Sequence, residues 1–275
     1  LGATFPRVIT ARDVLPIATS FRDQNTIWTL YNGGAVWYTT QAGRPWEQPE
    51  ESIVGGYPIN ISFRASIVLI GNSAGEVFIS TDNGTTFKYR LGTRNPGAAS
   101  AYVTTDPGYA TNKFAYCSIG YGALANGGIW RIKVDEKNPA ATDWERIDAD
   151  PTWAVGWATV EPTVAFDLAG VFYCWDDAVV NLAGNVGGMW RSTNPRDDVT
   201  GIYPPEWRKF KTNLRDGDQL AYASYATTPN TLFAWNRGAG VNYYEQLLAF
   251  TDTLGSPTEL VSPASGATNV GMQLN

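Results

Sequence analysis

The chain has 275 residues, no histidine, two cysteines and a formal net charge of −6. The acidic charge argues against a nucleic-acid partner. Without histidine the chain lacks the usual general base and the commonest metal ligand, and two cysteines are too few for a thiolate metal cluster. No apolar run approaches the roughly 20 residues of a transmembrane helix.

Short apolar runs and turn residues alternate along the chain, and no segment has the sustained helical period of 3.6 residues. The sequence GATF at residues 2–5, followed by PRVIT, is typical of the end of a strand unit. We expect residues 1–12 to form the last strand of a preceding sheet, with a chance match as the alternative. Five units of four short strands follow, which we expect at residues 13–50, 52–95, 98–149, 152–213 and 218–261.

The third strand of each unit runs into a turn that, in most copies, ends on an aromatic residue. The sequence VWYTTQAGRPW at residues 36–46 aligns without a gap with VFISTDNGTTF at residues 77–87. Residues 129–144, 189–207 and 247–258 repeat the pattern with other turn lengths. Four-strand units that recur about every 40 to 55 residues indicate a β-propeller. We therefore expect an all-β fold of four-stranded blades that is part of a larger propeller.

The most regular of these turns is STDNGTTF at residues 80–87. We expect its aspartate to accept hydrogen bonds from turn N–H groups, its glycine to take a backbone angle that other residues resist, and its aromatic ring to pack between blades. The residues of the pattern S-x-D-x-G-x-T-[WF] are Ser80, Asp82, Gly84, Thr86 and Phe87.

This pattern resembles the Asp-box (BNR) repeat of sialidases, sortilin-type receptors, xyloglucanases and photosystem assembly factors. The resemblance implies a propeller in which the box is structural and lies at the blade periphery, away from the usual ligand face. Other copies depart from the pattern, because Gln41 and Thr253 stand where the aspartate belongs.

Three consecutive units carry long loops between their second and third strands, at residues 118–128, 175–188 and 236–246. In a propeller such loops share one rim. Aromatic rings and amides suit a sugar-binding surface, the same residue types suit a protein contact, and packing loops without a ligand are the third alternative. The candidate rim residues are Tyr121, Asn126, Trp175, Asp176, Asp177, Asn181, Asn185, Arg237, Asn242 and Tyr243.

We expect no resident cofactor. Ca²⁺ prefers carboxylate and carbonyl oxygens, which Asp176 and Asp177 could offer, as could Asp197 and Asp198 on the opposite rim. Both pairs lack the spaced ligands of an EF-hand loop. Two further sites are the sequons at Asn60 and Asn83, which are candidates for N-glycosylation.

A glycosidase requires two carboxylates about 5 to 9 Å apart across the scissile bond, and the sequence marks out no such pair. The RIP stretch and arginine triad of sialidases are not recognisable, although Tyr243, Tyr244 and Glu245 are a weak counterpart of their Tyr–Glu pair. We expect binding rather than catalysis, with glycoside hydrolysis left open.

Cys117 and Cys174 fall at matched positions of neighbouring units. We expect either two buried thiols or a disulfide bridge between them.

The end of the chain, SPASGATNVGMQLN at residues 262–275, resembles the first strand of Ig-like or fibronectin-like modules of prokaryotic surface proteins, with a linker as the alternative. We expect an extracellular or cell-surface protein with a structural or adhesive role, for example in a surface layer, sheath or filament. Its expected partners are proteins or further copies, and also glycans. The alternatives are a carbohydrate-active propeller and a receptor for peptides.

Overall fold

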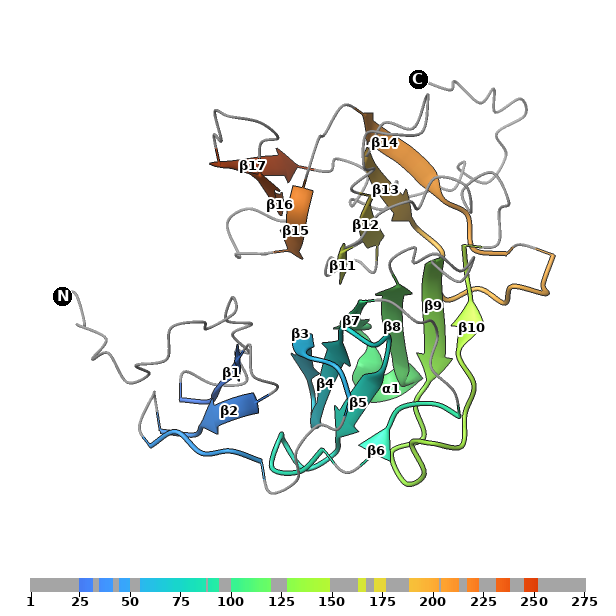
Figure 1. Cartoon of the computed structure of the whole chain (residues 1–275). Helices are drawn as coiled ribbons and strands as arrows, with labels where there is room; N and C mark the ends of the chain where they lie inside the picture. The colour runs from blue at the N-terminus through green and yellow to red at the C-terminus, as the bar shows by residue number, and fades with distance from the viewer. Residues whose placement is uncertain are drawn as a thin grey trace, which may run out of the picture.

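Figure 1 shows the chain as a computed structural model. It describes residues 25–31, 35–41, 45–49, 55–87, 89–93, 100–119, 128–148, 163–166, 171–176, 188–202, 204–212, 217–222, 231–237 and 245–251. Within these ranges the chain forms β-strands and one helical turn, α1 (Tyr109–Asn112). The expected leading strand at residues 1–12 and the expected Ig-like segment at residues 262–275 lie outside the described residues.

Three antiparallel sheets have four strands each, in chain order across the sheet. The first comprises β3 (Pro58–Arg64), β4 (Ile67–Asn72), β5 (Val77–Ser80) and β6 (Tyr89–Arg90). The second comprises β7 (Ala101–Thr105), β8 (Phe114–Ile119), β9 (Gly128–Lys133) and β10 (Glu145–Arg146). The third comprises β11 (Thr163–Phe166), β12 (Phe172–Asp176), β13 (Gly188–Ser192) and β14 (Arg208–Thr212).

Two smaller antiparallel sheets flank these three in the sequence. One comprises β1 (Ile27–Tyr31) and β2 (Ala35–Thr39). The other comprises β15 (Gly217–Tyr222), β16 (Thr231–Arg237) and β17 (Glu245–Thr251).

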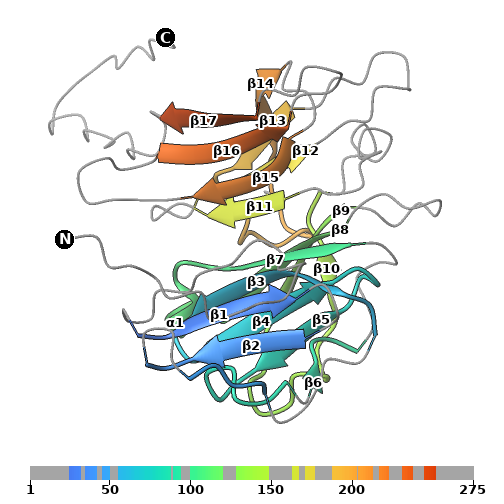
Figure 2. The same cartoon turned by 60° about the vertical axis from the view of Figure 1, so that its left-hand side comes forward.

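The first strands of successive sheets lie side by side. β3 contacts β7, β7 contacts β11, and β11 contacts β15. Figure 1 shows these strands gathered toward the middle of the molecule, with β6, β10 and β14 at the outside, and Figure 2 shows the same neighbours from a second direction. Four-stranded meanders set around a shared inner region are the architecture of a β-propeller, so the expected all-β propeller fold is confirmed, whereas the expected number of blades stays a prediction.

The β3–β6 sheet is apolar on both faces because it packs between two others. On β4, Ile67 and Leu69 face the β7–β10 sheet, while the alternate residues Val68 and Ile70 face the β1–β2 sheet. All four are fully buried. Successive side chains of a strand point to opposite faces, so a strand buried on both sides has a nearly continuous apolar sequence, as IVLIG does.

Cys117 and Cys174 occupy matched places, opposite Trp130 and Trp190 in the registers of their sheets. Both are buried, and neither forms a disulfide. Cys117 packs in the cluster shared with the β3–β6 sheet, whereas Cys174 packs in the cluster shared with the β7–β10 sheet. Each thiol therefore faces the preceding sheet, and burial raises the pKa of Cys117 well above its usual value.

Candidate functional site

Of the predicted rim residues, Trp175 and Asp176 are the last two residues of β12, and Arg237 is the last residue of β16. The two strands therefore end where the long connections to β13 and β17 begin. The remaining rim residues lie outside the described residues, as does Tyr244: they are Tyr121, Asn126, Asp177, Asn181, Asn185, Asn242 and Tyr243. Their role stays a prediction.

The turn between β5 and β6 is closed by its own side chains. The Asp82 carboxylate accepts hydrogen bonds from the Thr86 N–H at 2.9 Å, the Thr86 hydroxyl at 2.8 Å and the Ser80 hydroxyl at 2.6 Å. The Ser80 oxygen accepts the Gly84 N–H at 2.7 Å. Burial raises the pKa of Asp82, but the hydrogen bonds outweigh burial and leave the pKa below its ordinary value. The carboxylate therefore stays charged inside the turn.

Part of this closure recurs in the β11–β14 sheet. Asn194 follows β13 as Asp82 follows β5, and its carboxamide oxygen accepts the Glu206 N–H at 2.8 Å, just as Asp82 accepts the Thr86 N–H. Both donors immediately precede the aromatic residue of their turn. The alignment of the repeated units did not identify Asn194, because the turn after β13 is much longer. The spacing of Ser192 and Asn194 is nevertheless that of Ser80 and Asp82.

Gly84 and Phe87 fasten the β5–β6 turn to the β1–β2 sheet. Gly84 has a φ of +86°, and a Cβ there would lie 2.1 Å from Nε1 of Trp28 on β1. Phe87 is 2% exposed and packs in one cluster with Trp28, Leu30 and Phe78. The glycine thus permits a close approach between two sheets, and the phenylalanine fills the space beside it.

The sequon asparagines lie in different settings. Asn83 sits in the β5–β6 turn with a φ of +61°. The carboxamide oxygen of Asn60, on β3, accepts the Val103 N–H of β7 at 2.8 Å. A glycan on Asn60 would therefore start beside a contact between two sheets, whereas one on Asn83 would start from a turn. Modification of either asparagine stays a prediction.

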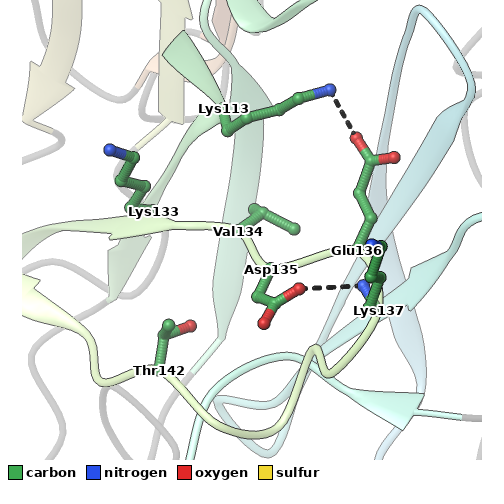
Figure 3. A pocket seen from close by; sticks show the side chains of 7 residues that line it. All are labelled: Lys113, Lys133, Val134, Asp135, Glu136, Lys137 and Thr142. Carbon is green, nitrogen blue, oxygen red and sulfur yellow. Dashed lines mark hydrogen bonds and ion pairs between the residues drawn. The ribbon is translucent and has the colours of Figure 1, made fainter.

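A hollow of about 550 Å³ lies at one end of the β7–β10 sheet (Figure 3). The register pairs Phe114 with Lys133 at this end and Ile119 with Gly128 at the other end. The hollow is therefore opposite the β8–β9 connection, to which the predicted rim residues Tyr121 and Asn126 belong. Its lining residues are Lys113, Lys133, Val134, Asp135, Glu136, Lys137 and Thr142.

One wall of the hollow is a hydrogen-bonded corner around Glu136. Lys113 directly follows α1 with a φ of +63°, and its Nζ donates to Oε1 of Glu136 at 2.8 Å. The Tyr109 hydroxyl donates to the same oxygen at 3.1 Å. Burial and the neighbouring Glu136 raise the pKa of Tyr109 far above its usual value, so the phenol remains a hydrogen-bond donor.

Asp106, which follows β7, is a fully buried carboxylate outside the hollow. Arg196, in the β13–β14 connection, donates to its two oxygens at 2.7 and 2.8 Å, and the Gly108 N–H donates at 2.7 Å. Burial raises the pKa of Asp106, whereas the hydrogen bonds of Arg196, Asn112 and Gly108 lower it, and the net pKa lies below its ordinary value. The pair joins the second and third four-stranded sheets.

Arg131 on β9 holds the same connection from its own sheet. It donates to the carbonyl oxygens of Pro195 at 2.8 Å and Asp197 at 2.9 Å, and its Nε donates to Glu145 at 3.2 Å. The guanidinium is 5% exposed and lies 4.9 Å from the centre of the Phe114 ring. Its five donors suit this role, because a guanidinium can bind several oxygens in one plane.

Asp148 is a second fully buried carboxylate, paired with Nε of Arg146 at 2.7 Å. Burial raises the pKa of Asp148, and the bonds of Arg146 do not offset it. Asp106 and Asp148 thus each have an arginine partner, which is an arrangement that holds sheets and turns together. Neither Asp106 nor Asp148 lines the hollow.

Two tryptophans make the same contact between successive sheets. The indole N–H of Trp144 donates to the Leu91 carbonyl oxygen at 3.0 Å, and that of Trp207 donates to the Ile147 carbonyl oxygen at 3.0 Å. Each acceptor directly follows the fourth strand of the preceding sheet. Trp46 holds the equivalent place after β2, and its buried indole N–H has no acceptor among the described residues.

The second aspartate pair considered for Ca²⁺ serves the turn itself. Asp197 accepts the Asn194 amide at 3.0 Å, and Asp198 accepts the Thr200 N–H and hydroxyl at 2.9 and 2.8 Å. Within the described part of the chain, no cluster of three or more histidine, cysteine, aspartate or glutamate side chains could hold a metal ion.

No helix in the same ranges is long and apolar enough to cross a membrane.

No protein-family model matches the sequence, and no curated protein matches it. Among solved structures, the chain is similar to the β-propeller domain of Cps50 (Swd1) from Myceliophteria thermophila, with a TM-score of 0.57, 9% identity, and coverage of 89% of this chain and 73% of that chain. It is similar to an ancestral GH74 enzyme, with a TM-score of 0.53, 16% identity, and coverage of 86% and 32%.

The chain is also similar to the GH74 xyloglucanase from Xanthomonas campestris, with a TM-score of 0.51, 14% identity, and coverage of 81% of this chain and 34% of that chain. At these identities the likeness establishes the β-propeller fold alone. The chain spans about a third of the length of the two GH74 enzymes.

Proposed function

We propose that the chain is an Asp-box β-propeller portion of a larger extracellular or cell-surface protein, with a structural or adhesive role. In this proposal residues 1–261 supply five blades and one leading strand of a larger propeller, and residues 262–275 lead into an Ig-like module. The shared closure of the turns at Asp82 and Asn194 supports the repeat assignment.

The observation that carries the proposal is the set of polar contacts between successive sheets. Apolar packing alone would allow sheets to slide, whereas hydrogen bonds and ion pairs are directional. The contacts are Asn60 to Val103, Trp144 to Leu91, Trp207 to Ile147, Arg131 to Pro195 and Arg196 to Asp106. Arginines and carboxylates that could serve chemistry are thus used to make a rigid body, as a load-carrying or adhesive module requires.

Surface labelling tests this role. An antibody raised against the purified chain should label intact cells that produce the parent protein, and an in-frame deletion of residues 25–251 should weaken attachment between cells or to a surface. Label that appears only after the cells are permeabilised would contradict the proposal. So would a deletion strain whose attachment and envelope are unchanged.

A carbohydrate-active propeller is the second candidate. It is favoured by the fold likeness to GH74 enzymes, three of which have TM-scores above 0.5, and by the predicted rim with Trp175 and Asp176 at the end of β12. Release of reducing ends from xyloglucan by the purified parent protein would favour this candidate. A glycan array probed with the chain would separate sugar binding without hydrolysis from the structural role.

A further inference from the structure

An asparagine followed by a glycine lies inside the β5–β6 turn, at Asn83 and Gly84. In this dipeptide the glycine nitrogen can attack the side-chain carbonyl carbon of the asparagine. A C–N bond forms, ammonia leaves, and water opens the succinimide ring to aspartate or isoaspartate. Glycine favours the reaction because no side chain shields its nitrogen and its backbone rotates freely. Thr81 and Asp82 of the same turn are exposed, so dipeptide and exposure alone predict a reactive site.

The attacking nitrogen is nevertheless held in a buried hydrogen bond. The Gly84 N–H donates to the Ser80 oxygen at 2.7 Å. Ser80 is 1% exposed, and its own hydroxyl donates to Asp82 at 2.6 Å. The electron pair of a peptide nitrogen is delocalised into the planar peptide bond, so the nitrogen must lose its proton and its peptide plane must turn before attack. Both changes require the bond between Gly84 and Ser80 to break.

The turn also lacks a strong base for the Gly84 proton. A chain of hydrogen bonds leads from the Gly84 N–H through the Ser80 hydroxyl to the Asp82 carboxylate. The carboxylate accepts the Thr86 N–H and hydroxyl as well, and its pKa lies below the ordinary value. A carboxylate with a lowered pKa is a poor proton acceptor. The chain of bonds therefore keeps the proton on the nitrogen.

The backbone on either side of the dipeptide is fixed by neighbouring strands. The Asn83 N–H donates to the Ser66 carbonyl oxygen at 3.4 Å, and Asn83 has a φ of +61°. Gly84 approaches Trp28 so closely that a Cβ would lie 2.1 Å from Nε1 of the indole. The peptide between Asn83 and Gly84 therefore cannot turn far unless the turn moves away from Trp28.

We propose that the β5–β6 turn is a gated deamidation site, in which Asn83 is preserved while the Gly84 N–H is bonded to Ser80 and reacts once this bond opens. Isoaspartate adds a carbon to the backbone between residue 83 and the Gly84 nitrogen, which displaces Gly84 from Trp28. Deamidation thus makes a transient opening of the turn irreversible. The gate is a property of the turn and does not depend on the proposed structural role.

The test is peptide mapping by mass spectrometry of the purified full chain after incubation at mildly alkaline pH, native and in urea. The Asn-Gly pairs at residues 32–33 and 126–127 are internal references for the unfolded chain, in which all three pairs should react at similar rates. In the native chain Asn83 should react at least about tenfold more slowly than in urea, because reaction requires local opening. Reaction of Asn83 at the same rate in both conditions would overturn the proposal.

Two variants separate local opening from global unfolding. Ser80→Ala removes the acceptor of the Gly84 N–H and should accelerate native deamidation of Asn83 about fivefold, as expected for loss of one hydrogen bond. Ser80→Cys keeps a weaker acceptor, should give a smaller acceleration, and replaces Ser80→Ala if a circular dichroism melt shows that variant to be unfolded. Trp207→Phe removes a hydrogen bond in another sheet and should leave the rate at Asn83 unchanged. An unchanged rate in the Ser80 variants, or equal acceleration by Trp207→Phe, would contradict the gate.

Discussion

The turn after β5 and the connection after β13 close in the same way but are anchored differently. In both, an Asx side chain accepts the N–H of the residue before an aromatic ring, Asp82 in the first and Asn194 in the second. Both also bond within themselves, but the long connection is held in addition by two arginines. Arg131 binds it from the neighbouring sheet, and Arg196 binds from it to Asp106 of that sheet. Closure of the turn therefore depends on where the accepting side-chain oxygen lies. The additional residues of the long connection are stabilised by contacts between sheets.

The largest effect should come from filling the close approach at the short turn. Gly84→Ala would place a Cβ 2.1 Å from Nε1 of Trp28 at a φ of +86°. Overpacking and the left-handed backbone together should lower the free energy of unfolding by about 3 kcal/mol, measured by urea denaturation. Trp28→Phe in the same chain should recover part of this loss, because it shortens the ring. Strict additivity of the two substitutions would contradict the close approach.

Removing the charge that anchors the long connection should have the second largest effect. Asp106→Asn would leave Arg196 without its carboxylate and should lower the free energy of unfolding by about 2 kcal/mol. The loss is smaller than for a fully enclosed pair, because the Arg196 side chain is 38% exposed and can be solvated. Urea denaturation at pH 7 measures it.

The pH dependence of that loss follows from the lowered pKa of Asp106. Charged Asp106 stabilises the fold fully above its unfolded pKa of about 3.9, and this stabilisation disappears as the pH falls through the lower folded pKa. The difference between wild type and Asp106→Asn should therefore shrink below about pH 4. Asp148 has a raised pKa, so the difference between wild type and Asp148→Asn should change in the opposite direction. A constant difference for Asp106→Asn down to pH 3 would refute its pairing as the source of stability.

The strands were predictable from the sequence, whereas the anchors of the long connection were not. Runs such as IVLIG predict strands buried on both faces, and the spacing of Asp82, Gly84 and Phe87 predicts a tight turn with an aromatic end. Asp106 and Arg196 are 90 residues apart, and nothing local marks either as a partner of the other. The hollow was also missed, although the charged run KVDEK at residues 133–137 was a signal for it.

The comparison of the two closures predicts that the charge on Asp82 is dispensable. Asp82→Asn keeps an oxygen for the Thr86 N–H, as Asn194 does for Glu206, and should cost little. Asp82→Ala removes the acceptor and should lower the free energy of unfolding by about 1.5 kcal/mol. Thermal unfolding of the two variants at pH 7 measures the contrast. Equal losses would mean that charge, not geometry, closes the turn.

A smaller effect should come from making the aromatic end of the long connection like that of the short turn. Trp207→Phe removes the N–H that donates to the Ile147 carbonyl oxygen and should lower the free energy of unfolding by about 1 kcal/mol. Phe87 packs in its cluster without such a donor, so a phenylalanine at this place is compatible with packing between sheets. Trp46→Phe is the matched control.

The same change of ring at Trp46 removes a buried N–H that has no acceptor within the described ranges. Its loss should therefore cost less than that of Trp207, since no hydrogen bond to a described residue is broken and a buried donor without an acceptor in the described ranges is removed. Urea denaturation of both variants gives the comparison. A loss at Trp46 as large as at Trp207 would show that the hydrogen bond to Ile147 is not what distinguishes the two rings, and that the packing of the indole itself supplies the stability.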